Sequence, residues 1–289
     1  MSVDEQAQEA SGESYIYDYE GSMTKSIMTR RTVSDSAAFF LPYLRPGNNL
    51  LDMGCGQGSI TIGLAQAISP GSAIGVDIEE SQVRAAEKRA MEQRVSNVTF
   101  LVGDIYHLDF DRDRFDVVFS HAVLDHLQRP VDALKEAWRV LKPGGIIGVR
   151  AADFEGFLIA PVDPLLEKGK SLQIRFRKHS GGSPLVGRDL RALLREAGFH
   201  NTRGFASCMY AGTSEEINAR VAPAIESWTG PKIREAALRL GWADASYFEA
   251  VERALRKWGE SPDSFSAVVH CEAIGWKSSQ QIDSGRPGS

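Results

Sequence analysis

The sequence has little cysteine and no excess of basic charge. Its 289 residues include three cysteines, and 38 acidic residues outnumber 33 lysines and arginines. Three cysteines without a CxxC pair exclude a disulfide framework and a zinc site of the usual spacing, so we expect a reduced, cytoplasmic protein without a metal. A net charge of −5 argues against a nucleic-acid partner, because phosphate contacts need lysine and arginine.

Long hydrophobic segments are also missing. No apolar run approaches the roughly 20 residues that a membrane-spanning helix needs, so we expect no membrane span. The acidic, polar start of the chain lacks the features of a secretory signal. We expect residues 1–32 to form a flexible arm and residues 278–289 to form a disordered tail. The remaining 33–277 has the size of one large domain.

Within 33–277, short apolar segments alternate with helical patterns. Strands are expected at 49–52, 73–76, 98–102, 115–119, 145–149, 199–209 and 265–276, and helices at 34–44, 59–68, 80–94, 130–141 and 189–197. This alternation is typical of an α/β fold with a doubly wound, mostly parallel, seven-stranded sheet. Residues 151–186 lack a clear period and are expected to form a variable substrate segment. Residues 213–260 are rich in Trp and Ala and predict a helical lid inserted in the domain.

A glycine-rich turn follows the first expected strand. Gly54, Gly56 and Gly58 stand at alternate positions, where glycine lets the backbone turn tightly and approach a ligand. A dinucleotide-binding fingerprint would need glycine where Ser59 stands. Asp52, just before the turn, would repel a pyrophosphate but suits a ligand that carries an ammonium group. The turn therefore favours an aminated ligand over a nicotinamide cofactor.

Acidic residues also end the second and third expected strands. Asp77 is placed to accept hydrogen bonds from both hydroxyls of an adenosine ribose. Asp104 is placed to accept from an exocyclic adenine amine, and its apolar neighbour Ile105 can cover the ring. These positions indicate a nucleoside ligand.

Together these motifs, from 50 to 149, resemble the class I S-adenosylmethionine-dependent methyltransferases, in particular those similar to ubiquinone and menaquinone methyltransferases. The resemblance implies a Rossmann-like methyltransferase fold, with S-adenosylmethionine as cofactor and S-adenosylhomocysteine as product. Enzymes of this fold that methylate an amino group of adenine or glutamine carry an Asn/Asp-Pro-Pro-Tyr run after the fourth strand. This chain has Ser120-His121-Ala122-Val123 there, which argues against that chemistry.

The resemblance also implies residue roles in cofactor binding. The expected cofactor-binding residues are Asp52, Gly54 and Gly56 for the methionine part, Asp77 and Ile78 for the ribose and adenine face, Asp104 and Ile105 for the adenine edge, and Ser120 and His121 beside the sulfonium. Gly58, in the same turn, is also expected to contribute to the cofactor site. Two further residues lie in the expected arm. We expect Tyr19 to close over the pocket and Arg31 to bind the cofactor carboxylate.

The expected reaction is in-line displacement of the methyl group by a small, partly apolar acceptor. His121 and Asp153 are the predicted catalytic residues, and His179 is a further candidate base. The sequence leaves open whether oxygen, nitrogen or carbon is methylated, and whether the protein is a monomer or a homodimer. Three alternatives remain: a macromolecular acceptor, a nicotinamide-dependent oxidoreductase, and a non-catalytic S-adenosylmethionine-binding protein.

Overall fold

The computed structural model describes residues 31–279 of the chain. Seven strands form one sheet, with the bounds β1 (Asn49–Met53), β2 (Ser72–Asp77), β3 (Val98–Val102), β4 (Phe115–His121), β5 (Leu141–Ala160), β6 (His200–Ala211) and β7 (Phe265–Trp276). They lie in the order β3-β2-β1-β4-β5-β7-β6, and β7 runs antiparallel to β5 and β6. The predicted doubly wound, mostly parallel sheet is confirmed. Strand order reverses between β1 and β4, and ligands bind at such a switch point, outside the carboxyl ends of the strands.

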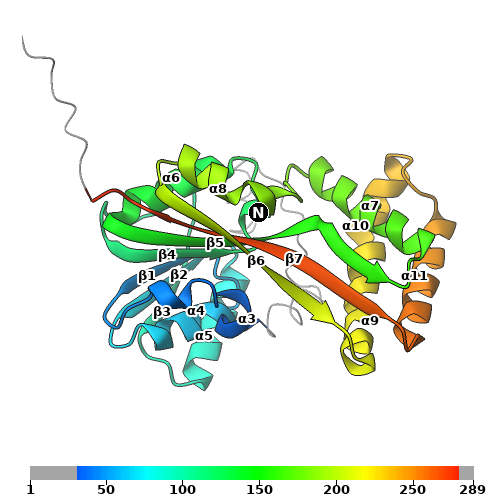
Figure 1. Cartoon of the computed structure of the whole chain (residues 1–289), viewed down its shortest axis with the longest axis horizontal. Helices are drawn as coiled ribbons and strands as arrows, with labels where there is room; N and C mark the ends of the chain where they lie inside the picture. The colour runs from blue at the N-terminus through cyan, green and yellow to red at the C-terminus, as the bar shows by residue number, and fades with distance from the viewer. Residues whose placement is uncertain (1–30, 280–289) are drawn as a thin grey trace, which may run out of the picture.

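Helices cover both faces of the parallel half of the sheet (Figure 1). One face carries α3 (Val33–Ser36), α4 (Ser59–Ala67) and α5 (Glu80–Glu92), and the other carries α6 (Pro130–Val140) and α8 (Val186–Glu196). In β4, Val117 and Phe119 pack with the core beside α4, whereas Val118 packs with Leu134 and Leu190 of α6 and α8. The strand is buried on both sides, which explains its continuous apolar run.

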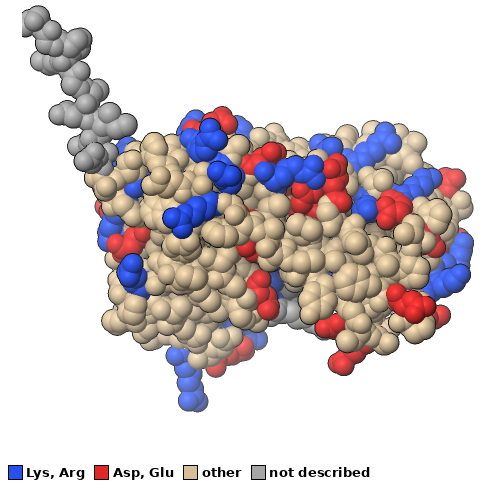
Figure 2. Space-filling view, in the orientation of Figure 1, with Lys and Arg blue, Asp and Glu red and all other residues tan. Residues whose placement is uncertain are grey.

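The last three strands continue beyond this core and carry a second group of helices (Figure 1). This helical lobe consists of α7 (Pro164–His179), α9 (Ser214–Thr229), α10 (Pro231–Arg239) and α11 (Ala245–Glu260). It has its own apolar core, which includes Leu166, Trp228 and Phe248. The indole N–H of Trp258 donates to the carbonyl of Ala160 at 2.9 Å and fastens the lobe to the end of β5. Between α3 and α9 the molecular surface is indented (Figure 2).

Residues 151–186 are more regular than their sequence pattern indicates. The fifth strand, expected to end at residue 149, runs on to Ala160, and α7 follows it. The pairing of β5 with β7 shifts register between Asp153 and Phe157, and such a bulge breaks the two-residue alternation. Helix α7 buries Gly169 and Gln173 beside two leucines, so its inner face lacks a clear apolar period.

The helix expected at 34–44 is much shorter in the structure. Helix α3 ends at Ser36, and a short 3-10 helix, η1 (Leu41–Tyr43), follows. Pro42 lies inside the expected helix, where it removes a backbone donor and restricts the preceding residue. A second 3-10 turn, η2 (Leu124–His126), follows β4. Within 31–279, no helix combines the length and hydropathy that crossing a membrane requires.

Candidate active site

The glycine turn lies where the carboxyl ends of β1 and β2 meet. The N–H groups of Gly54 and Cys55 both donate to the carbonyl of Val76, at 2.8 and 3.0 Å. Gly54 has a φ of +76° and Gly56 a φ of +51°, in the region that favours glycine. A Cβ on Gly54 would overlap the side chain of Val123. The turn therefore packs directly against the segment that follows β4.

Gly58 differs from the first two glycines of the turn in what it packs against. It precedes α4 with a φ of +70°. A Cβ there would lie 2.7 Å from the Phe100 ring and 2.8 Å from the Ala86 methyl group. The small size of Gly58 thus lets α4 pack closely against β3 and α5.

Two buried carboxylates flank the turn. Asp52 accepts a hydrogen bond of 2.6 Å from the hydroxyl of Thr61. Asp77 accepts from the N–H of Gly56 at 2.8 Å and from that of Glu79 at 3.1 Å. Across the described range, neither acid forms an ion pair with a lysine or arginine. Buried carboxylates are ordinarily paired, so this pair suits a ligand that brings a positive charge and hydroxyl donors.

Burial shifts the pKa of both acids upwards. Burial raises the pKa of Asp52 to about 7, with a smaller upward contribution from the charge of Asp77 and an opposing one from the Thr61 hydrogen bond. Burial also raises the pKa of Asp77, although hydrogen bonds from the backbone of Glu79 and Gly56 oppose the shift. A bound cation would favour the ionised form of both acids.

The third expected acid lies at the rim of the same edge. Asp104 follows β3, is half-buried, and accepts the N–H of Tyr106 at 2.8 Å. Ile105 is half-buried and packs on the main core, and Ile78 is half-buried just after β2. Because β2 and β3 are paired neighbours, the predicted ribose and adenine residues follow adjacent strands.

The end of β4 carries Ser120 and His121, and both are buried. Ser120 donates its hydroxyl proton to the carbonyl of Met53 at 2.9 Å, which ties β4 to the end of β1. His121 pairs across the sheet with Arg150, and Arg150 pairs with Glu272. Directly opposed residues point to the same side of a sheet. These three side chains therefore form one row, on the face that also carries Phe119 and α4.

Hydrogen bonds join this row into a network. The Arg150 guanidinium donates to Glu272 Oε1 at 3.1 Å, to Ser207 Oγ at 3.2 Å and to His121 Nδ1 at 3.4 Å. Ser207 in turn donates to Glu272 Oε1 at 2.5 Å. The ring of His270 stacks against that of His121, with 6.3 Å between centroids. We call His121, Arg150, Glu272 and Ser207 the polar row.

His121 is neutral in this setting. Burial lowers its pKa well below the ordinary value, and the charges of Arg31 and Arg150 add to the effect. Arg31 is half-buried, and its charge acts on His121. Tyr19, the other arm residue predicted to contact the cofactor, lies outside the described residues, as do most of the predicted arm and tail.

The structure does not bring Asp153 together with His121. Asp153 lies three positions beyond Arg150 in unbroken β5 pairing, so its side chain is on the opposite face. There it receives two hydrogen bonds from Arg188 of α8, at 2.6 and 2.8 Å, and two from the backbone of Glu155 and Gly156. These bonds outweigh burial, which alone would raise the pKa of Asp153, and hold it below its ordinary value.

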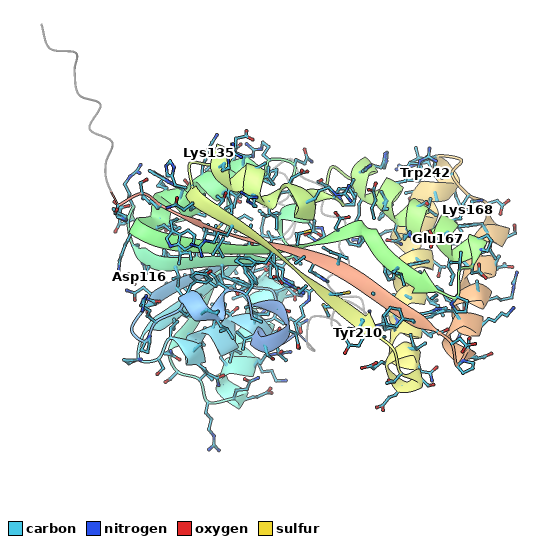
Figure 3. All side chains as sticks on the ribbon, viewed as in Figure 1. Asp116, Lys135, Glu167, Lys168, Tyr210 and Trp242 are labelled. Atoms are coloured by element: carbon cyan, nitrogen blue, oxygen red, sulfur yellow. The ribbon has the colours of Figure 1, made fainter. Side chains whose placement is uncertain are left out.

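His179 also lies apart from the polar row. It is exposed at the end of α7, and its ring packs edge-on against Trp242 with 5.3 Å between centroids. Trp242 lies at the outer side of the helical lobe (Figure 3). Among residues 31–279, no cluster of three or more His, Cys, Asp and Glu side chains is arranged to hold a metal ion.

Comparison with known proteins identifies the family. A family model described as a methyltransferase domain matches residues 44–179. The chain is 30% identical over 280 residues to the protein named "Probable methyltransferase ltbC" from Aspergillus luteorubrus. The aligned region covers 91% of this chain and 97% of that protein. The chain belongs to the S-adenosylmethionine-dependent methyltransferases. The predicted family, enzyme class and cofactor are confirmed.

One further relative agrees with this assignment, and one solved structure shares the fold. The methyltransferase is 31% identical over 252 residues to 27-O-demethylrifamycin SV methyltransferase of Amycolatopsis mediterranei (strain S699), covering 85% of this chain and 84% of that one. Its fold is similar to that of the YcgJ protein from Bacillus subtilis, with a TM-score of 0.56, 22% identity, and coverage of 83% and 97%.

The raised pKa of Asp52 predicts a pH-dependent affinity for the cofactor. The predicted contact of Asp52 with the ammonium group of the cofactor requires the ionised carboxylate, whose population rises as the pH passes about 7. We expect S-adenosylmethionine to bind the methyltransferase roughly eightfold more weakly at about pH 6 than at about pH 7.5. Calorimetric titration across this range measures the effect. Asp52→Asn should bind weakly with a flatter profile, and a wild-type affinity that is constant across the range would contradict the prediction.

Proposed function

We propose that this methyltransferase transfers the methyl group of S-adenosylmethionine to a small-molecule acceptor held between the core sheet and the helical lobe. The observation that carries the proposal is the pair of buried acids, Asp52 and Asp77, on either side of a glycine turn with left-handed backbone angles at a strand switch point. We propose that residues 33–277 form one domain, in which the insertion 213–260 acts as the lid.

The cofactor contacts follow from the positions of the strand ends. Asp52 would bind the amino group, the backbone at Gly54 and Gly56 would lie along the methionine part, and Asp77 would accept the ribose hydroxyls. The remaining cofactor contacts that we propose are Ile78, Asp104 and Ile105 around the adenine, Ser120 and His121 beside the sulfonium, and Arg31 near the carboxylate. Gly58 supports the turn through its packing against Phe100.

When bound, S-adenosylmethionine supplies an electrophilic methyl group on a sulfonium. The protein then has to align the acceptor with that methyl group and to exclude water. His121 is the polar side chain best placed for the acceptor, because it ends β4 at the switch point and lies on the face of the sheet that carries Phe119 and α4.

A small acceptor is favoured by the lobe and by the relatives. Beyond the polar row along β5, the ring of Phe157 meets that of Trp228 of the lobe edge to face. The printed name of the Amycolatopsis relative gives it a small-molecule substrate. Several relatives are named demethylmenaquinone methyltransferase, one of them 28% identical over 206 residues.

A methyl-transfer screen tests the proposal. Phenols, quinols, amines and indoles would be compared with protein and RNA fractions, with labelled S-adenosylmethionine as donor. For the best small acceptor, His121→Ala should lower kcat/KM by about 10- to 100-fold, because one hydrogen bond in a buried site is lost. His200→Ala, an exposed histidine at the amino-terminal end of β6, is the matched control. Labelling of only a macromolecular fraction would contradict the proposal.

A further inference from the structure

The polar row fixes the protonation state of His121. The guanidinium of Arg150 lies 3.4 Å from His121 Nδ1. A guanidinium has donors and no acceptor, so Nδ1 must accept and must be unprotonated. A neutral imidazole that accepts at Nδ1 carries its single proton at Nε2. The contact with Arg150 therefore selects the Nε2–H form of the ring.

The Nε2–H group is left for a ligand. In the part of the chain that the structure describes, His121 Nε2 is shielded from solvent and has no hydrogen-bond partner. An unpaired buried donor is destabilising, and this donor lies on the last residue of β4, at the proposed methyl-transfer site. Its natural partner is a hydrogen-bond acceptor atom on the molecule that receives the methyl group.

We propose that Arg150 is a positioning residue that holds His121 as a hydrogen-bond donor, and that the methylated molecule therefore binds as an ionised acidic hydroxyl, a phenolate or enolate, rather than as an amine. The inference rests on the proposed function. It assigns the substrate class from the direction of one hydrogen bond in the polar row.

The lone pairs of the acceptor atom explain the preference. An amine nitrogen has one lone pair, and a hydrogen bond from His121 Nε2–H would occupy the pair that must attack. An oxyanion has further lone pairs, so one accepts from Nε2–H while another forms the bond to the methyl carbon. The new O–CH3 bond forms, the S–CH3 bond breaks, and its electron pair stays on sulfur. The hydroxyl proton leaves to solvent before binding, because His121 has no free basic nitrogen.

The surrounding groups keep the protonation state of the polar row constant over the pH range of the assays. The charged or titratable groups near the polar row are Arg31 and Asp35 beside α3, Asp125 on η2, Arg150 on β5, and His270 and Glu272 on β7. Burial, followed by the charge of Arg150, lowers the pKa of His270 to about 3, so this ring is also neutral. Glu272 balances the charge of Arg150 through their direct ion pair. The rate should therefore follow ionisation of the acceptor and not of a histidine.

Nitrogen NMR of the histidine rings tests the tautomer without any turnover. The chain has six histidines, and loss of one ring signal in His121→Gln assigns His121. We expect the Nε2–H pattern in wild type at neutral pH and a mixed or reversed pattern in Arg150→Met. If Arg150→Met does not fold, the double variant Arg150→Met/Glu272→Gln, which removes both charges of the ion pair, is measured in its place. A wild-type ring that is protonated at Nδ1 would overturn the inference.

Kinetics test the substrate class. Substituted phenols of different acidity would be assayed across pH with S-adenosylmethionine kept saturating at every pH, so that the titration of Asp52 does not enter, and the acidic limb of kcat/KM for the phenol should move with the pKa of each phenol. A limb fixed at one pH for all phenols would indicate a protein base and overturn the inference. His121→Gln, which keeps an N–H donor, should retain about tenfold more activity than His121→Leu.

Two results separate this inference from the proposed function. If calorimetry detects no binding of S-adenosylmethionine, or if only macromolecules are labelled, the proposed function itself fails. If the cofactor binds and small amines are methylated while ionisable phenols and enols are not, the proposed function stands and only the assignment of an oxyanion acceptor is overturned.

Discussion

Replacing Asp77 by alanine is expected to abolish most of the affinity of this methyltransferase for S-adenosylmethionine. The ribose would lose two hydrogen bonds to a buried carboxylate, each contributing roughly 1.5–3 kcal/mol, so that the dissociation constant should rise at least about 100-fold. The N–H of Gly56, which donates to Asp77 at 2.8 Å, would lose its partner as well. Isothermal titration of the cofactor, with circular dichroism to check the fold, measures both effects.

A conservative variant and a matched control make this result interpretable. Asp77→Asn keeps an oxygen that can accept from Gly56 and should preserve the turn, yet it should still bind the cofactor poorly. Asp116 lies at the amino-terminal end of β4, away from the switch point (Figure 3), where it accepts from Lys142 at 2.7 Å. Asp116→Asn should change cofactor affinity by less than about twofold. Equal affinity in Asp77→Ala and wild type, with both folded, would show that the ribose contact is misplaced.

The cofactor half of the site was predictable because its residues follow strand ends that the sequence marks clearly. Asp52 and Asp77 lie in the last two residues of β1 and β2, and the glycine turn and Asp104 come just after β1 and β3. In a doubly wound sheet, the carboxyl ends of the parallel strands lie along one edge. The order of strand and turn along the chain therefore encodes which residues gather at that edge.

The polar row was not predictable in the same way. Arg150 contacts His121 across 29 positions and Glu272 across 122 positions, so the contact depends on the register of β4, β5 and β7. The only local signal is a charged residue inside an apolar strand, as at Arg150 and Glu272. Such a residue in a buried strand needs a partner, but the sequence does not say which.

The difficulty of locating strand ends from sequence also explains why Asp153 was predicted to lie beside His121. Placing it in the acceptor pocket assumed that the fifth strand ends at residue 149, so that Asp153 would follow a strand end as His121 does. The strand instead continues to Ala160, and alternation turns Asp153 towards α8. Strand ends are well marked where glycine or an acid follows, and poorly marked where an apolar strand runs on into an inserted region.

Gly54→Ala is expected to lower both the stability of the protein and its affinity for the cofactor. The left-handed φ of +76° would cost an alanine about 1 kcal/mol. Overlap of the new methyl group with Val123 would add roughly 1–3 kcal/mol, as for other overpacked sites. Relief of the overlap requires the segment after β4 to move away from the turn, which would displace His121 from the proposed cofactor. Thermal unfolding and cofactor titration measure the two consequences.

Two variants isolate the contact with Val123 from the backbone strain. Gly144 has a similar φ of +80°, but a Cβ there would meet no atom within 4 Å, so Gly144→Ala should show only the strain, about 1 kcal/mol. Gly54→Ala/Val123→Ala should recover stability and cofactor affinity relative to Gly54→Ala alone, because the overlapping methyl groups are removed. If the double variant is no better than Gly54→Ala, the loss arises from the turn itself, and close packing between the turn and the β4 segment is not what shapes the cofactor site.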